Sequence, residues 1–151
     1  MAEHFNPSLS VIVQTFGQLT TRQLYQILKV RAAVFVVEQN CPYQDLDDID
    51  FEARHITLWQ GDTLVAYSRV YQDAASGMWH IGRVLSTQRK QNYGLRIMHE
   101  ALRVARELGV GCIEIEAQSY AIPFYERFGF RISSEEYLLD GILHTRMLVN
   151  L

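Results

Sequence analysis

The sequence predicts an α+β fold, in which one mixed sheet of about seven strands is flanked by helices. Three extended segments follow one another in the middle of the chain, which is typical of an antiparallel meander. One amphipathic helical segment precedes this meander, and a second one follows it. Because the meander and a C-terminal hairpin interrupt the alternation of strand and helix, a doubly wound parallel sheet is not expected. The length of 151 residues fits a single domain, expected over 1–151.

The N-terminal part is expected to form a strand and then a helix. The strand is predicted over residues 10–16, where Val11, Val13 and Thr15 alternate with Ile12 and Gln14. Thr20 and Gln23 have the spacing of a capping box, so a helix is expected to begin there. Apolar residues then recur at helical spacing. This helix should end before Pro42, since the residue before a proline is disfavoured in the helical conformation.

The meander is predicted from its turn residues as much as from its strands. Gly-Asp at 61–62 and Ser-Gly at 76–77 are favourable turn sequences between extended segments. The three strands are expected over residues 54–60, 63–72 and 79–86.

The last part of the chain is expected to contain two more helices and three more strands. Pro123 suits the first turn of a short helix, and Gly129 suits its end. Asp140-Gly141 is a turn signal between two extended runs, so it predicts a hairpin. The remaining elements are expected as a helix over about 91–108, a strand over 112–116, and hairpin arms over 130–139 and 142–149.

Composition excludes several classes of protein. The formal net charge is −3, so the basic excess of a protein that binds long nucleic acids is missing, and no such partner is expected. Residues 1–6 lack the pattern of a signal peptide, and no apolar run is long enough to span a membrane. We therefore expect a cytoplasmic protein. Cys41 and Cys112 are expected to be reduced thiols, and neither has the spacing of a metal ligand, so no metal is expected.

Two segments are candidates for chemistry. Arg89, Lys90 and Arg96 lie near the predicted start of the helix over 91–108, where cations oppose the helix dipole. One explanation for these cations is an anion, such as phosphate, bound to the free backbone N–H groups at the helix start. The alternative explanation is a basic turn that is only solvated. Tyr125 lies beside core phenylalanines, so its hydroxyl faces a cleft or has only a structural role.

The chain resembles the GNAT superfamily of acetyl-coenzyme-A-dependent N-acetyltransferases over nearly its whole length. Within that superfamily it is similar to the ElaA-like group. The resemblance rests on the stretches at residues 31–43, 81–84, 124–130 and 140–144, which read RAAVFVVEQNCPY, IGRV, FYERFGF and DGILH. The first of these is long and specific, and the third is typical of many GNAT proteins.

The resemblance implies a GNAT fold that binds acetyl-CoA, or CoA, as co-substrate. Backbone groups of Val84 and Leu85 would hold the pantetheine arm. The phosphate-binding loop would begin at Arg89. Lys90 and Asn92 stand at positions where glycines are common in the family. Asparagine tolerates the left-handed backbone conformation well. The other cofactor-binding positions implied by the resemblance are Gln91, Tyr93, Gly94, Leu95, Gln118, Phe124 and Tyr125.

The resemblance also implies a mechanism in which a primary amine attacks the thioester directly. Tyr125 is the position of the acid that protonates the departing thiolate, and the Val84 N–H would stabilise the oxyanion. An alkyl ammonium has a pKa of about 10.4, so a base or desolvation is needed. Glu38 is the first candidate for this base. Its alternative role is a structural hydrogen bond, and the other candidates for the base are His55, His144, Glu114 and Glu116.

Several alternatives stay open from the sequence. The acidic segment over 45–52 is either a solvated loop or a surface that steers a cationic amine, and it lacks the pattern of a calcium loop. The acceptor is expected to be a small-molecule or peptide amine. Trp79, Tyr137 and the C-terminal strand are candidates for a sheet-edge homodimer. The competing functions are a non-catalytic module that binds acyl-CoA and an interaction protein with a vestigial site.

Overall fold

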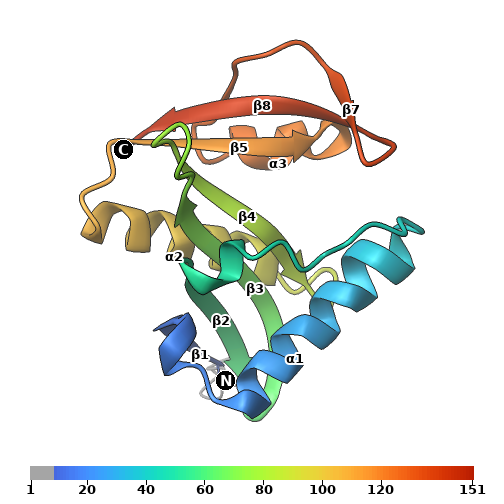
Figure 1. Cartoon of the computed structure of the whole chain (residues 1–151), viewed down its shortest axis with the longest axis vertical. Helices are drawn as coiled ribbons and strands as arrows, with labels where there is room; N and C mark the ends of the chain where they lie inside the picture. The colour runs from blue at the N-terminus through green and yellow to red at the C-terminus, as the bar shows by residue number, and fades with distance from the viewer. Residues whose placement is uncertain (1–8) are drawn as a thin grey trace, which may run out of the picture.

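In the computed structural model, which describes residues 9–151, eight strands form one sheet with helices on both faces (Figure 1). The expectation of no signal peptide concerns residues that lie outside this range. Neighbouring strands run in the order β1-β2-β3-β4-β5-β8-β6, and β7 also pairs with β8. All neighbouring pairs are antiparallel except β4 with β5, so the sheet is mixed as predicted. The strands are β1 (Leu9–Thr15), β2 (Arg54–Gln60), β3 (Thr63–Gln72), β4 (Trp79–Ser86), β5 (Cys112–Gln118), β6 (Arg131–Ile132), β7 (Tyr137–Leu139) and β8 (Ile142–Asn150).

The sheet has one strand more than predicted because the first arm of the C-terminal hairpin is interrupted. The arm expected over 130–139 is divided into β6 and β7. The hydroxyl of Ser134 accepts a hydrogen bond of 2.9 Å from the backbone N–H of Arg146 in β8. A side chain thus takes the place of a backbone acceptor in the ladder, so the chain leaves the sheet between the two short strands.

The helices begin and end close to the predicted residues. Thr20 caps α1 (Thr21–Arg31), where the side chains of Thr20 and Gln23 each accept a hydrogen bond from the other's backbone N–H. α1 continues as a π-helix, η2 (Ala32–Glu38), which ends before Pro42 as predicted. The remaining helices are α2 (Tyr93–Glu107), α3 (Ile122–Glu126) and the 3₁₀-helices η1 (Phe16–Gln18), η3 (Ile49–Phe51) and η4 (Ser119–Ala121).

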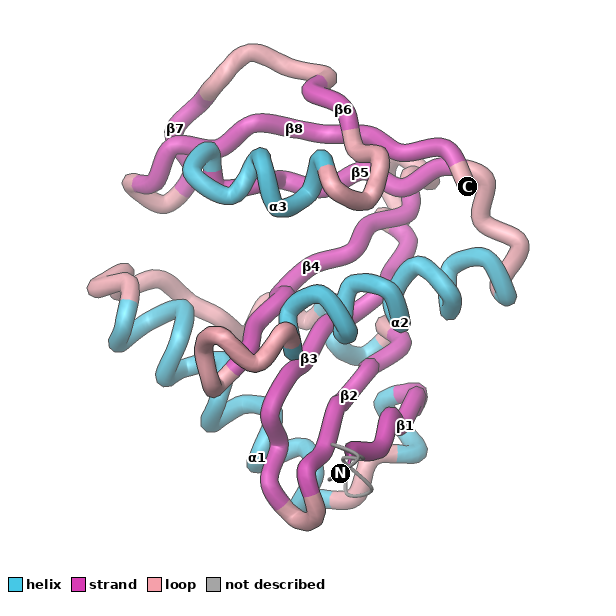
Figure 2. The backbone as a smooth tube through the Cα atoms, turned by 180° about the vertical axis from the view of Figure 1, so that it is seen from behind, coloured by secondary structure: helices cyan, strands magenta, loops and turns pink. Residues whose placement is uncertain are grey.

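The main core lies between the sheet and α2. Ile97, Met98 and Ala101 of α2 are fully buried and belong to one cluster with apolar side chains of the sheet. α1 lies on the opposite face of the sheet, whereas α2 and α3 are both seen from behind (Figure 2). There a smaller cluster joins Ile27 of α1 to Tyr67 of β3. None of the helices in the described range is long and apolar enough to cross a membrane.

β4 and β5 pair along only a short part of their length and then separate. These parallel strands pair only at Trp79 with Ile113 and at His80 with Glu114. Beyond His80 they diverge, as the tube in Figure 2 shows. Within the described chain, therefore, the edge of β4 that faces β5 has no sheet partner from Ile81 to Ser86.

Candidate active site

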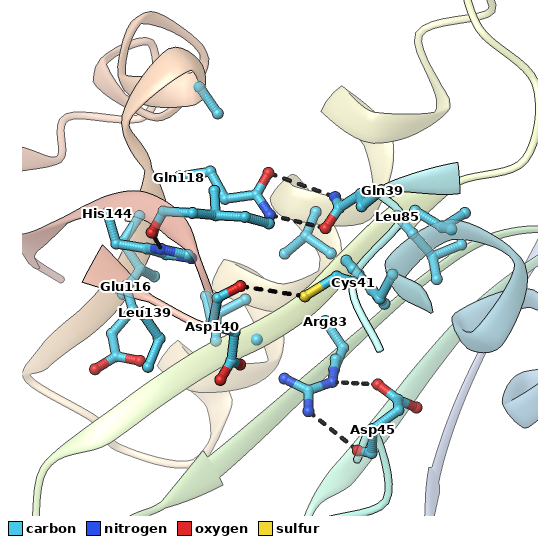
Figure 3. Close-up of a pocket in the computed structure, with 18 of the residues that line it drawn as sticks. Gln39, Cys41, Asp45, Arg83, Leu85, Glu116, Gln118, Leu139, Asp140 and His144 are labelled. Atoms are coloured by element: carbon cyan, nitrogen blue, oxygen red, sulfur yellow. Dashed lines mark hydrogen bonds and ion pairs between the residues drawn. The ribbon is translucent and has the colours of Figure 1, made fainter. Parts of the chain in front are cut away.

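A cavity of about 800 Å³ lies where β4 and β5 diverge. η2 and the segment after it form one wall, and β4 and β5 form the floor. η4 and α3 contribute further lining residues, and so do β3 and the loop before α2. The turn between β7 and β8 also lines the cavity through Leu139 and Asp140 (Figure 3). Val84 and Leu85 both line this cavity, which is where the predicted contact with a pantetheine arm requires them.

A β-bulge distorts β4 at the cavity. The register between β3 and β4 shifts between Tyr67 and Arg69, which face Leu85 and Gly82 respectively. Arg83 has a φ of 52°, which places this non-glycine residue in the left-handed region. Such conformations cost free energy and concentrate at functional sites.

The acidic segment is not a free acidic surface, and the interpretation as a solvated loop is wrong for three of its carboxylates. Asp45, Asp47 and Asp50 form ion pairs with three arginines. The pairs close into a ring of alternating charge, in the order Arg31, Asp45, Arg83, Asp47, Arg69, Asp50 and back to Arg31, with N–O distances of 2.6–3.4 Å. We call these six residues the charge ring. Because its charges cancel, the ring has little attraction for a distant amine.

The charge ring is largely buried, and Asp45, Arg69 and Arg83 are its members that line the cavity. The side chains of Arg31 and Arg69 are 0% and 1% exposed. Burial alone would disfavour ionisation of Asp50, but hydrogen bonds and charge from Arg31 and Arg69 outweigh it and lower the pKa of Asp50. The pKa of Asp47 is lowered against burial in the same way, chiefly by Arg69. The three aspartates are therefore acceptors for arginine and not candidate bases.

His55 is also excluded as the base. It is fully buried next to the charge ring and does not line the cavity. Its Nε2 lies 2.9 Å from the Asp50 carbonyl, and its Nδ1 lies 2.7 Å from the Tyr67 hydroxyl. A neutral ring that donates from Nε2 and accepts at Nδ1 satisfies both partners. Burial lowers the pKa of His55, which agrees with a structural role.

The other candidate bases are divided by their positions. Glu38, Glu116 and His144 line the cavity, whereas Glu114 does not. The ring of His144 is held by a 2.7 Å contact between Nδ1 and the Ile142 carbonyl. Glu116 is exposed and comes two residues after Glu114, the last residue of β5 that pairs with β4. It forms none of the ion pairs found in the described range.

The end of η2 and the segment after it contact three different parts of the chain across the cavity. Glu38, the last residue of η2, forms an ion pair with Arg89. The side-chain amides of Gln39 and Gln118 pair reciprocally, with N–O distances of 3.0 and 3.5 Å (Figure 3). The Cys41 thiol lies 3.4 Å from the Asp140 carbonyl, and both Cys41 and Cys112 are free, as expected.

The predicted phosphate loop has the backbone that glycines would supply. Lys90 and Asn92 have φ values of 64° and 60°, so both adopt left-handed conformations at the positions where the family commonly has glycine. The side chain of Arg89 is 74% exposed, and Gly94 lines the cavity. Gln91 is exposed and Leu95 is half-buried, whereas the Tyr93 side chain is buried in the core, which leaves only its backbone for a ligand.

The basic residues around this loop are less available than their sequence suggests. Arg96 forms an ion pair with Glu100 one turn further along α2, and Arg89 is paired with Glu38. Lys90 is exposed and has no ion-pair partner in the described part of the chain. The attraction for an anion therefore depends on the loop backbone, on Lys90, and on release of Arg89 from Glu38.

Tyr125, the predicted acid, is surrounded by aromatic side chains. It lines the cavity together with Phe124 and packs edge-on against Phe124 and Phe130, with ring centroids 5.1 and 6.0 Å away. Burial raises the pKa of Tyr125 to about 12. The phenol therefore keeps its proton at neutral pH, and its O–H can donate a hydrogen bond to a group that develops negative charge.

Sequence analysis missed the roles of Arg69, Arg83 and Gln39. Arg69 offered a signal, because an arginine within a largely apolar strand needs acidic partners if it is buried. The acidic segment over 45–52 was the available source of those partners.

Comparisons with known proteins agree with this geometry. Residues 21–151 match the family model described as an acetyltransferase (GNAT) domain. Protein ElaA of Escherichia coli is 40% identical over 137 residues, which are 87% of this chain and 90% of ElaA.

Solved structures give the same assignment. The crystal structure of Escherichia coli ElaA superposes with a TM-score of 0.86 at 36% identity, covering 93% of this chain and 98% of that one. An acyl-CoA N-acyltransferase from Pseudomonas aeruginosa superposes with a TM-score of 0.87 at 36% identity, covering 93% and 99%. The sheet with its divergent β4 and β5, and the match over residues 21–151, show that this chain belongs to the GNAT acetyltransferase family and is a homologue of ElaA.

Proposed function

We propose that this protein transfers the acetyl group of acetyl-CoA to a primary amine, which attacks the thioester directly in a ternary complex. The observation that carries the proposal is a half-buried, protonated Tyr125 in the same cavity as the unpaired edge of β4. The similar protein from Pseudomonas aeruginosa, an acyl-CoA N-acyltransferase by name, supports an acyl-CoA as donor.

The residues present fit acetyl-CoA as the donor substrate. The free β4 edge at Val84 and Leu85 offers backbone groups to the amides of a pantetheine arm. The left-handed residues Lys90 and Asn92 shape the loop before α2, where backbone N–H groups at a helix start favour a pyrophosphate. Arg89 would add a charge-assisted contact once it leaves Glu38.

The proposed reaction has three requirements that named groups would meet. The amine nitrogen, freed of its proton, forms a bond to the thioester carbonyl carbon. The Val84 N–H would stabilise the oxyanion that develops on the carbonyl oxygen. The carbon–sulfur bond then breaks, and the thiolate takes the proton of the Tyr125 hydroxyl, which is regained from the amine through the base or solvent.

Glu116 becomes a stronger candidate for the base than the sequence suggested. Glu38 is engaged by Arg89, whereas Glu116 lies at the divergence of β4 and β5 with no ion-pair partner in the described residues. Either carboxylate, or His144, could accept the amine's proton through a water molecule.

The test is acetyl transfer to a panel of small amines and peptides, followed by thiol release and by the mass of the product. The expected result is an acetylated amine formed in proportion to free CoA. If CoA binds and no amine is acetylated, the protein is a non-catalytic acyl-CoA-binding module. If calorimetry shows no CoA binding, the proposal is wrong, and an interaction protein with a vestigial site is the remaining function.

A further inference from the structure

The left-handed bulge in β4 is held by the side chain of the residue that forms it. Arg83, with its φ of 52°, lies where the register between β3 and β4 shifts. A left-handed conformation is disfavoured for every residue with a Cβ, and arginine has no special tolerance of it. The side chain must therefore make contacts that favour this conformation over an ordinary strand.

These contacts come from two aspartates of the charge ring. The Arg83 Nε lies 2.8 Å from Oδ1 of Asp45, and Nη2 lies 3.0 Å from the Asp45 carbonyl oxygen (Figure 3). Nη2 also lies 3.4 Å from Oδ2 of Asp47. The guanidinium stacks over the Phe35 ring, 5.9 Å from its centroid. Four contacts from three residues therefore fix the direction of this side chain.

The two aspartates are themselves fixed from the opposite side. Asp45 accepts from Arg31 at 2.9 Å, and Asp47 accepts from Arg69 at 2.6 and 2.9 Å. Both of these arginines are buried, while the side chain of Arg83 is 28% exposed. Arg83 is thus the most exposed arginine of the charge ring, and it lines the cavity together with Asp45 and Arg69. The buried Arg31 and Arg69 anchor the two aspartates that hold it.

We propose that Arg83 is a positioning residue: held by Asp45 and Asp47, it keeps the β4 bulge left-handed so that the next residue, Val84, presents its backbone N–H to the thioester carbonyl. This inference rests on the proposed acetyl transfer. Two observations connect the bulge to the reaction. Val84 directly follows Arg83 on the strand edge that has no sheet partner in the described chain, and both residues line the cavity.

A direct contact with an anionic substrate is the competing role for Arg83. The geometry argues against it, because the guanidinium already serves Asp45 and Asp47, and the three arginines and three aspartates of the charge ring balance. A group already paired in this way gains little from a further anion. The two roles make opposite predictions for glycine, which adopts the left-handed conformation without cost but carries no charge.

The experiment compares Arg83→Ala, Arg83→Gly and Arg83→Lys in the full chain, with Arg131→Ala, an exposed arginine of β6, as control. For Arg83→Ala we expect kcat to fall about tenfold and the KM for acetyl-CoA to change less than about twofold, as loss of a transition-state contact requires. Arg83→Gly should recover kcat to within about threefold of the wild type. Arg83→Lys should be slower than Arg83→Gly, because its ammonium lacks the fork that bridges the two aspartates.

The folded fraction of each variant is measured by circular dichroism at the assay temperature. If Arg83→Ala does not fold, the kcat values of Arg83→Gly and Arg83→Lys decide between the two roles. A role in binding an anionic substrate would make Arg83→Lys the faster of these two variants. Equal rates for Gly and Ala, or Lys faster than Gly, would overturn the inference. Absence of acetyl transfer by the wild type would instead overturn the proposed function, so the two failures are distinguishable.

Discussion

The carboxylate of Glu38 forms an ion pair with the guanidinium of Arg89 at the rim of the cavity. The sequence suggested a base for the first residue and a phosphate contact for the second, yet in this state each neutralises the other. Their side chains are 49% and 74% exposed, so the pair is readily exchanged for another partner. A bound pyrophosphate would compete with Glu38 for Arg89.

Removing the charge of Glu38 is therefore expected to strengthen the binding of CoA. Glu38→Gln frees Arg89, and an exposed pair of this kind changes affinity by about two- to fivefold. Isothermal calorimetry with CoA measures the change. Glu52→Gln, an exposed acid that does not line the cavity, is the matched control and should leave affinity unchanged. Weaker binding by Glu38→Gln would contradict the expected competition.

Tyr125→Phe should separate chemistry from binding. The substitution removes only the hydroxyl from a ring packed against Phe124 and Phe130, so folding and CoA affinity should persist. Loss of the proton donor is expected to lower kcat by about 100-fold. Tyr120→Phe is the control, because Tyr120 lines the same cavity with an exposed side chain.

The pH profile gives a second measure of Tyr125. A pKa of about 12 keeps the phenol protonated across the usable range, so kcat should show no descending limb from this residue below about pH 11. An unchanged kcat for Tyr125→Phe would remove Tyr125 from the mechanism.

Most of the fold could be predicted because short-range signals determine it. The meander strands have the predicted bounds, since turn residues such as those at 61–62 end one strand and begin the next. The capping box at Thr20 located α1 in the same way. The interruption between β6 and β7 could not be predicted, because it depends on the Ser134 hydroxyl meeting a backbone N–H in β8.

The candidate site was less predictable because its contacts join segments far apart in the sequence. Asp45 is 38 residues from Arg83, and Gln39 is 79 residues from Gln118. No local pattern states which acid meets which arginine, so the acidic segment was expected to be solvated or to steer a substrate. The left-handed Asn92 was easier to predict, because asparagine tolerates that conformation by itself.

Replacing Gly94 by alanine is expected to raise stability and to weaken CoA binding. A Cβ built at this position would meet only the Phe124 ring, at an ordinary distance of 3.8 Å, so nothing in the protein requires glycine there. Gly94→Ala in α2 should raise the free energy of unfolding by about 0.5–1 kcal/mol through helix propensity. If the pyrophosphate approaches this turn closely, the same methyl group should weaken CoA binding by about tenfold or more.

Thermal unfolding and calorimetry on Gly94→Ala test both parts of this prediction. Gly17→Ala, which has free space around its Cβ and does not line the cavity, is the control for affinity. Unchanged CoA affinity in the more stable Gly94→Ala variant would place the pyrophosphate away from this turn.

Stability should fall in two stages as the pH is lowered. Burial lowers the pKa of His55, so the ring stays neutral when folded, whereas the unfolded chain takes up its proton near pH 6.5. Stability from His55 is thus present above about pH 6.5 and falls below it, by at most about 1.4 kcal/mol per pH unit until its lowered folded pKa is reached. Asp47 and Asp50, whose pKa values are lowered, contribute stability that is lost only below about pH 4.

The measurement is the unfolding midpoint in urea between pH 8 and pH 3, for the wild type and His55→Gln. The variant should be less stable at pH 8, because contacts to Tyr67 and Asp50 are lost, but its stability should stay level down to about pH 5. Below pH 4 both proteins should lose stability together as the charge ring protonates. A wild type whose stability is level from pH 7.5 to pH 5 would show that His55 takes up a proton as easily in the folded protein as in the unfolded chain, against its burial between Tyr67 and Asp50.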